Sequence, residues 1–267
     1  MMLWPMHLEV LLRPGEIRVV QRRALFPHRG GGVEVYPVAA QLDVEPWRAS
    51  IDALDTVLLE AASSASVHVI VSDHFLRYAL VPWNENLVDE AERLAFARLA
   101  LQETFGSISA DWSLALDQQP AGQGSFVCAM DRELLQALRD TVGRRRMRLK
   151  SVRAALADRV NRHRRELKEQ VFCLASLEPA RVTLAFHGED GWIAVRARRT
   201  NGGLEDSLGS VLRQEAAAVG ALDGGTLYLI AEDAAALPPF ALHSWQVTPL
   251  GDLRRQPAAA EPLVTAD

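Results

Sequence analysis

Two stretches of this 267-residue chain begin in the same way, with three consecutive segments of β-strand character followed later by a helix and a further strand. The first stretch alternates apolar and polar residues on both sides of Arg13-Pro14-Gly15, which predicts an antiparallel hairpin, with a third strand over 33–38. The second stretch repeats the pattern as VFCLASL, RVTLAFH and WIAVRAR, with a helix over 204–219. There is no short-period repeat of the solenoid type. The chain is therefore predicted to be a duplicated α/β protein with mixed sheets.

The boundaries of the elements between these two stretches follow from capping and stop signals. Pro46 opens a helix whose apolar residues share one face, and Gly106 ends a second helix that begins at Asp89. Asp131 is an expected N-cap, with Gly143 as the stop of that helix, and a basic helix is expected over 154–168. We divide the chain into a first lobe with an inserted subdomain (1–166), a second lobe (167–255) and a disordered Pro/Ala-rich tail (256–267).

Composition agrees with a globular protein of two modest lobes, at 49% hydrophobic and 24% charged residues. Cys128 and Cys173 lie in apolar runs, which favours reduced core thiols in a cytosolic protein over a disulfide framework. The N-terminal segment has no basic region followed by a long apolar one, and no segment reaches the roughly 18 apolar residues of a spanning helix. The chain is expected to be cytoplasmic.

Charge is distributed unevenly along the chain. The formal net charge is −5, yet the segment 144–168 contains eleven Lys and Arg residues against two acidic ones, a net +9. On a helix, Leu156, Val160, His163 and Leu167 would share a buried stripe. The basic residues left largely in solvent would then be Arg153, Arg159, Arg162, Arg164, Arg165 and Lys168. The candidate binding residues are Arg144, Arg145, Arg146, Arg148, Arg162, Arg164 and Arg165.

Three kinds of partner suit this basic segment: anionic lipid, an acidic protein surface, or the chain's own acidic residues. Nucleic acid is a poorer match, because the segment contains no aromatic residue to stack on bases and the rest of the chain is acidic. We therefore expect no nucleic-acid binding.

Catalytic and cofactor motifs are not found in the sequence. The seven histidines are far apart and form no metal-binding motif. Ser72-Asp73-His74 has the residue types of a hydrolase, but triad members come from separate segments, so a polar turn between strands is expected there. No phosphate-binding GxxxxGK motif is present, and the glycines at 30–32 and 202–203 are interpreted as loops. No catalytic residue, metal or cofactor is predicted.

Segment by segment, the chain resembles the actin-like cytoplasmic proteins of pilus and type II secretion assembly, the family of PilM and the cytoplasmic domain of GspL. The matching segments are MHLEVLLRPGEIRVVQRR for the first hairpin, SFVCAMDRELLQALRDTVGRRRMRLKSVRAALADRV for a strand-helix-strand-helix unit, VFCLASLEPARVTLAFHGEDGWIAVRARR for the second hairpin and TLYLIAEDAAALPPF for a late strand and turn. A further match is the helix rich in Glu and Ala that follows VSDHFLRYALVPW. The resemblance implies duplicated actin-like, or ribonuclease H-like, lobes.

The resemblance also implies a function, because this chain departs from the nucleotide-binding members. Those members have an Asp-x-Gly type phosphate loop in both hairpins, where this chain has Arg13-Pro14-Gly15-Glu16 and Ser176-Leu177-Glu178-Pro179. The late turn, glycine-rich in the family, contains Glu232 and Asp233 here. We therefore expect a cleft that is narrow or filled by side chains near Glu178, Glu232 and Asp233. ATP hydrolysis is not expected.

The expected function is that of a non-catalytic scaffold in a type IV pilus or type II secretion-like assembly, peripherally associated with the bacterial inner membrane. Members of this family bind a short cytoplasmic peptide of a membrane partner in a groove of the fold, and the same mode is expected here. A motor ATPase and a second copy of the chain are further candidate partners. The alternative is an ATP-binding actin-like or sugar-kinase-like enzyme.

Overall fold

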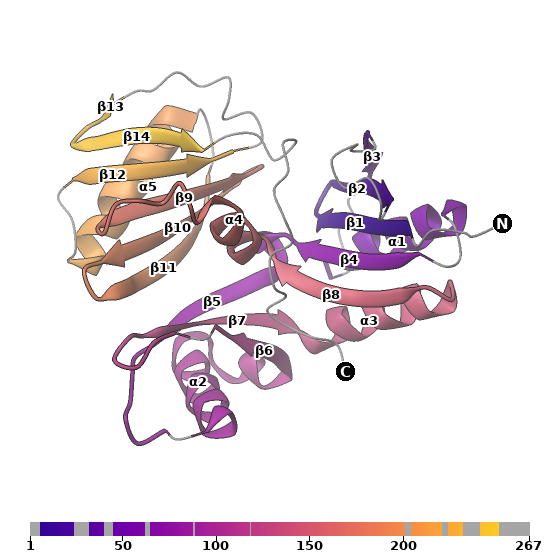
Figure 1. The fold of residues 1–267 in the computed structure, drawn as a ribbon, viewed down its shortest axis with the longest axis horizontal. Coiled ribbons are helices and arrows are strands. Elements are labelled where there is room, and N and C mark those ends of the chain that lie inside the picture. The colour runs from indigo at the N-terminus through magenta and orange to yellow at the C-terminus, as the bar shows by residue number, and fades with distance from the viewer. Residues whose placement is uncertain are drawn as a thin grey trace.

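The computed structural model describes residues 6–23, 32–39, 45–61, 65–87, 89–117, 119–200, 204–220, 224–231 and 241–250. These residues form three β-sheets with helices packed against them (Figure 1). The expected tail at 256–267, Glu232, Asp233 and the glycines at 30–31 and 202–203 lie outside the described residues.

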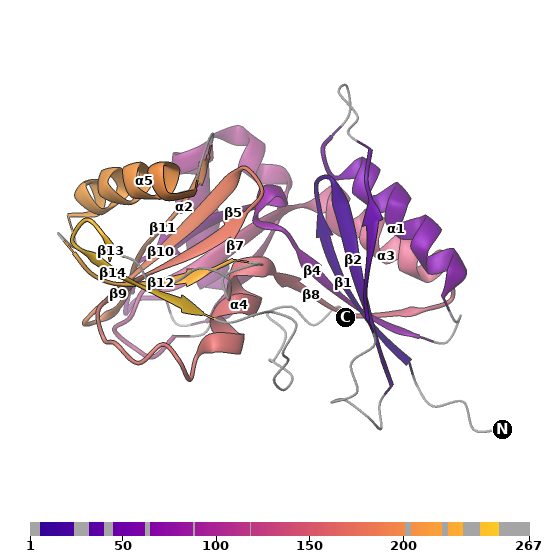
Figure 2. The same ribbon diagram turned by 90° about the horizontal axis from the view of Figure 1, so that it is seen from above.

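The first sheet has the strand order β3-β2-β1-β4-β8. Its strands are β1 (Met6–Arg13), β2 (Glu16–Arg23), β3 (Val33–Pro37), β4 (Ser66–Val71) and β8 (Arg148–Ala154). The predicted hairpin is confirmed: Arg13 pairs with Glu16, and Gly15 has φ 83°, the left-handed conformation that glycine adopts without strain. Helices α1 (Arg48–Glu60) and α3 (Arg132–Arg144) cover one face of the sheet (Figure 2) and close an apolar core over its inward-facing strand residues.

The second sheet repeats the plan of the first. Its strands, in the order β11-β10-β9-β12-β14-β13, are β9 (Phe172–Glu178), β10 (Arg181–Gly188), β11 (Gly191–Arg199), β12 (Gly225–Ile230), β13 (Ala241–Leu242) and β14 (Trp245–Leu250). Strands β9 to β11 form an antiparallel meander and β12 pairs parallel to β9, as β4 pairs parallel to β1. Helix α5 (Leu204–Val219) packs on one face. The duplicated α/β architecture predicted from the sequence is confirmed.

A third, smaller sheet is inserted in the chain between β4 and β8. It has the order β5-β7-β6, with β5 (Leu76–Val81), β6 (Trp112–Leu116) and β7 (Ser125–Asp131), and α2 (Glu90–Phe105) packs on it. Two short 3-10 turns, η1 (Asp73–Phe75) and η2 (Ser107–Asp111), connect these elements. Strand β5 lies along β11 of the second sheet (Figures 1 and 2), so the insertion contacts both lobes.

Two expectations on helix ends are wrong. The basic helix α4 (Ala155–His163) is shorter than 154–168, because β8 continues to Ala154 and a turn follows His163. Gly143 lies inside α3 and does not stop it; the stop is Arg146, which has φ 55°. Gly106 and Asp131 have their predicted roles, since Gly106 ends α2 with φ 78° and the Asp131 carboxylate accepts from the Glu133 N–H.

Both cysteines are free thiols, with Cys173 buried and Cys128 half-buried. Within the described residues, no helix is both long and apolar enough to cross a bilayer.

Candidate functional site

The first candidate site is the seam between the two lobes, where the sequence resemblance led us to expect a cleft. Ser72 and Asp73 follow β4, Arg159 lies on α4, and Ser176 and Glu178 lie on β9. All five side chains are buried. We call this group the seam cluster.

Hydrogen bonds and ion pairs join the seam cluster across the two lobes. The Ser72 hydroxyl donates to Glu178 Oε2 over 2.5 Å, and the Arg159 guanidinium lies 3.3 Å from Glu178 Oε1 and 3.8 Å from Asp73 Oδ2. Arg159 also donates to the Ser176 hydroxyl. Buried polar groups are stable only when they are paired, and these are paired with one another.

Asp73 completes the cluster on the side of the inserted sheet. Its Oδ1 accepts from the Tyr78 hydroxyl over 2.6 Å and from the Leu156 N–H over 3.2 Å. Burial and the nearby Asp73 raise the pKa of Glu178, and Arg159 opposes that rise. The expectation of a filled cleft is confirmed at Glu178. The triplet at 72–74 is a turn between β4 and β5, as predicted, although Ser72 and Asp73 are buried.

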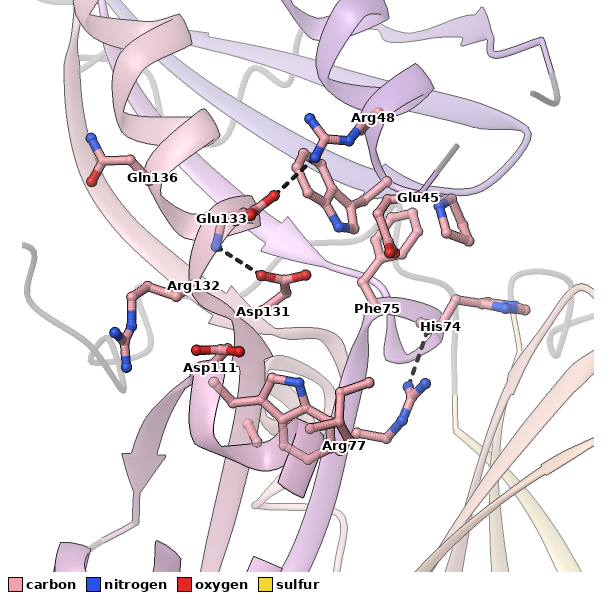
Figure 3. Close-up of a pocket in the computed structure, with 15 residues that line it drawn as sticks. Glu45, Arg48, His74, Phe75, Arg77, Asp111, Asp131, Arg132, Glu133 and Gln136 are labelled. Atoms are coloured by element: carbon pink, nitrogen blue, oxygen red, sulfur yellow. Dashed lines mark hydrogen bonds and ion pairs between the residues drawn. The ribbon is translucent and has the colours of Figure 1, made fainter. Parts of the chain in front are cut away.

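The second candidate site is an open pocket of about 830 Å³ between the first sheet's helices and the inserted sheet (Figure 3). This volume is in the range of pockets that hold small-molecule ligands. We call it the aromatic pocket, and its walls are Glu45, Pro46, Trp47, Arg48, His74, Phe75, Arg77, Ile108, Asp111, Trp112, Ala129, Asp131, Arg132, Glu133 and Gln136.

The walls of the aromatic pocket combine apolar side chains with a charged rim. Ile108 is 66% exposed, and Trp112 is half-buried. The rim is bridged by Arg48 on α1 and Glu133 on α3, whose charged groups are 2.8 Å apart (Figure 3). His74 Nε2 forms a hydrogen bond of 2.9 Å with the Pro179 carbonyl of the second lobe, and burial lowers its pKa.

The sequence did not predict this pocket, because its walls come from four separate segments of the chain, within 45–48, 74–77, 108–112 and 129–136. The one local signal was Ile108, an apolar residue within a polar, serine-containing turn.

The basic segment is divided between two places. Arg144 and Arg145 both reach Asp55 on α1, with Arg145 Nη2 at 2.6 Å. Arg146 and Arg148 are exposed and form no ion pair within the part of the chain that the structure describes. Arg164 and Arg165 are exposed in the turn after α4. Strand β8, which separates the two places, spans about 23 Å at roughly 3.3 Å per residue.

Three basic residues that were expected in solvent are largely buried. The side chains of Arg153, Arg159 and Arg162 are 10%, 4% and 9% exposed. Arg153 and Arg162 both bind Glu9 and Asp158, at 2.6 to 3.1 Å. The expectation was wrong because the helical stripe predicts only which apolar residues face inward. Helix α4 also packs against β4 and β8 of the first sheet, and its Arg159 reaches Glu178 of the second lobe. Lys168 is exposed, as expected.

No protein-family model matches the chain, and no curated protein matches its sequence. Solved structures do match. The cytoplasmic domain of EpsL, an inner-membrane component of the type II secretion system of Vibrio cholerae, has a TM-score of 0.58 at 15% identity over 92% of this chain and 90% of its own. The PilM-PilN type IV pilus biogenesis complex gives 0.56 at 14% identity over 85% and 81%.

A third match is a Bacteroides thetaiotaomicron protein with an actin-like ATPase fold and unknown function. Its TM-score is 0.58 at 10% identity, over 85% of this chain and 82% of its own. At such identities the likeness is one of fold. The chain therefore has the actin-like fold, as its sequence resemblance predicted, and it is similar in structure to proteins of type II secretion and type IV pilus assemblies.

Proposed function

We propose that this chain is a non-catalytic scaffold of a type IV pilus or type II secretion-like assembly, and that it recruits an inner-membrane protein by binding a short segment of that protein's cytoplasmic tail in the aromatic pocket. The observation that supports this most is the contrast between the two candidate sites. The seam is occupied by the chain's own buried side chains, while the aromatic pocket is open, about 830 Å³ in volume and lined by the exposed Ile108 and the half-buried Phe75 and Trp112.

Peptide binding suits the chemistry of this pocket. Ile108, Trp112 and Phe75 offer apolar contact area to one or two anchor side chains, and aromatic residues contribute most to such interfaces. The Arg48 and Glu133 side chains at the rim are 46% and 70% exposed, so they can exchange their mutual ion pair for hydrogen bonds to a peptide backbone. The pocket contains no arrangement that we assign to a chemical step.

The place of action follows from the proposed partner. A cytoplasmic scaffold that holds the tail of an inner-membrane protein is peripherally associated with that membrane. We propose that the exposed basic residues Arg146, Arg148, Arg164 and Arg165 contribute to this association by facing anionic lipid. A motor ATPase and a second copy of this chain are further proposed partners.

The peptide proposal is tested with 15-residue peptides that cover the cytoplasmic tails of inner-membrane pilus and secretion proteins encoded in the same genome. At least one peptide is expected to bind, and Ile108→Asp is expected to weaken it 10-fold or more, because a carboxylate would then face the apolar anchor. Leu99→Asp is the matched control, since Leu99 is 58% exposed on α2 and lies outside the pocket. Equal loss in both variants, or no binding peptide at all, would contradict the proposal.

The enzyme alternative is tested in the same preparation. A ligand at 100 times its Kd stabilises a protein by about 2.7 kcal/mol, which is visible as a shift in Tm. We expect no shift with ATP and Mg²⁺ at millimolar concentration, because Glu178 and Arg159 occupy the seam. A shift of several degrees would favour the ATP-binding reading.

A further inference from the structure

Three arginines meet where β5 of the inserted sheet lies along β11 of the second sheet (Figures 1 and 2). Arg77 is on β5, and Arg181 and Arg199 are directly opposite each other in the antiparallel register of β10 and β11. Directly opposite residues point to the same face of a sheet. Here that face is the one turned toward the inserted sheet, because Ala185 and Val195, which share it, pack with Tyr78 and Phe126.

No carboxylate of the described residues forms an ion pair with any of these three arginines. Arg77 donates only to the carbonyls of Leu76 and His74. The Nε of Arg181 is buried and has no hydrogen-bond partner. Burial, followed by the charges of Arg181 and Arg199, lowers the pKa of Arg77.

One described acidic residue lies beside the triad, and it is already engaged by other partners. Glu178 is opposite Arg181 in the register of β9 and β10, but its two oxygens bind Ser72 and Arg159. His74, which is also near Arg181, adds no negative charge. The three arginines therefore form a concentrated positive site, which we call the arginine triad.

Such a triad is unfavourable for the isolated protein, because like charges directly opposite each other in a sheet repel. On the other face of β11 the positive charges are neutralised within the protein, because Arg196 and Arg198 both pair with Glu215 on α5. Among the described residues, no such carboxylate pairs with the triad. An unpaired cluster of this kind points to an anionic partner from outside the chain.

The triad continues the aromatic pocket. Arg77 and His74 line the pocket, and His74 holds the Pro179 carbonyl two residues before Arg181. We propose that the arginine triad binds carboxylates of an acidic segment that adjoins the pocket-bound part of the partner's cytoplasmic tail. This inference rests on the proposed function and adds the chemistry of the partner: an apolar anchor next to Asp or Glu residues.

The test uses hexaglutamate and hexaglutamine as probes of the full-length chain, so that the triad is measured without an occupant in the pocket. At low salt we expect hexaglutamate to bind and hexaglutamine not to. Arg181→Gln/Arg199→Gln is expected to lower hexaglutamate affinity about 10-fold or more, and 150 mM salt to weaken it in the wild type. Arg139→Gln/Arg213→Gln is the matched control, because both residues are exposed, far from the triad in the fold and equal in charge change.

Two further measurements show whether a loss of hexaglutamate binding comes from the triad itself, from misfolding or from the pocket. The triad variant should have a higher Tm than the wild type at low salt, since a repulsion is removed, so a failure to fold is not expected to mimic loss of binding. Ile108→Asp should bind hexaglutamate like the wild type, so the failure of the pocket and of the triad are distinguishable.

The proposal is overturned if hexaglutamate binds the wild type and the triad variant equally, if it binds neither, or if hexaglutamine binds as well. It is also overturned if pyrophosphate displaces hexaglutamate at micromolar concentration, because the triad would then be a phosphate site.

Discussion

A single guanidinium balances two buried carboxylates in the seam cluster. Arg159 is the only cation within 4 Å of Asp73 and Glu178 among the described residues, while Ser72, Tyr78 and a backbone N–H provide the remaining hydrogen bonds. A buried pair of opposite charges stabilises little in itself, but removing one member leaves an uncompensated charge in a medium of low dielectric constant. Arg159 is therefore the residue of the seam whose loss should leave the largest uncompensated negative charge between the lobes, although the Ser72–Glu178 and His74–Pro179 hydrogen bonds also join them.

We predict that Arg159→Met lowers the free energy of unfolding by about 3–5 kcal/mol at pH 7.5. Arg139→Met, an exposed arginine on α3, should change it by no more than about 0.5 kcal/mol. Urea unfolding followed by circular dichroism measures both. Similar, small effects of the two substitutions would show that Arg159 does not hold the seam.

The penalty in Arg159→Met should depend on pH. The pKa of Glu178 is above its ordinary value of 4.5 in the folded protein, so the folded state holds this proton more tightly than the unfolded chain. The stabilising contribution of such a group is complete below pH 4.5 and is lost as the pH rises through the folded-state pKa. Without Arg159 the pKa rises further, so the penalty should shrink when unfolding is measured at pH 5 instead of pH 7.5.

At the scale of elements, local sequence signals predicted where helices begin better than where they end. Asp89 and Asp131 cap helices as expected, because an N-cap needs only a side-chain oxygen at one position. The end of α3 was misassigned to Gly143, since a glycine near the end of a helix is a stop only when it takes the left-handed conformation. Here Arg146 takes it instead, and Met147 bonds back to Val142.

Two glycine substitutions test this reading of helix ends. Gly106→Ala should destabilise the protein by about 1–3 kcal/mol, because φ 78° with ψ −163° is a region open essentially to glycine. Gly143→Ala should stabilise it by about 0.5–1 kcal/mol, because this position is helical. An added Cβ meets no atom within 4 Å at either position, so only the backbone differs. Thermal unfolding measures both, and shifts of the same sign would contradict the assignment.

At the scale of the whole molecule, the duplicated lobes were predictable and the contacts between them were not. Strand alternation and the order of segments indicated the two openings, and the resemblance supplied the actin-like fold. The partner of Ser72 lies 106 residues away, and no periodicity connects Ser72 with Glu178. The proximity of Arg181, Arg199 and Arg77 was not predictable either. It depends on the register of β10 and β11 and on the packing of β5 against β11.

The proposed association with the membrane depends on several exposed arginines together, and the structure shows which of them to substitute. Arg144 and Arg145 are left unchanged because they bind Asp55, and the variant is Arg146→Glu/Arg148→Glu/Arg164→Glu/Arg165→Glu. Each basic residue near an anionic surface contributes about 1 kcal/mol. We expect the wild type to sediment with vesicles that contain 30% phosphatidylglycerol at low salt, and the variant not to.

The control for the membrane test is Arg139→Glu/Arg213→Glu, which places new acidic residues on α3 and α5. It should sediment with the vesicles more strongly than the fourfold variant. Absence of wild-type sedimentation, or equal sedimentation of wild type and fourfold variant, would leave protein recognition as the role of these residues.

Helix α4 joins the lobes in a way that limits how such a protein can be divided. Its Asp158 and Arg162 bind Glu9 and Arg153 of the first sheet, and its Arg159 binds Glu178 of the second. A second lobe released by cutting the chain after residue 166 would lose the Ser72 and Arg159 partners of Glu178, and each lobe would expose the surface that it now buries against the other. The two lobes have the same strand plan. Replacing one of them by the corresponding lobe of another protein would nevertheless require matching changes in the charged residues of the lobe that remains.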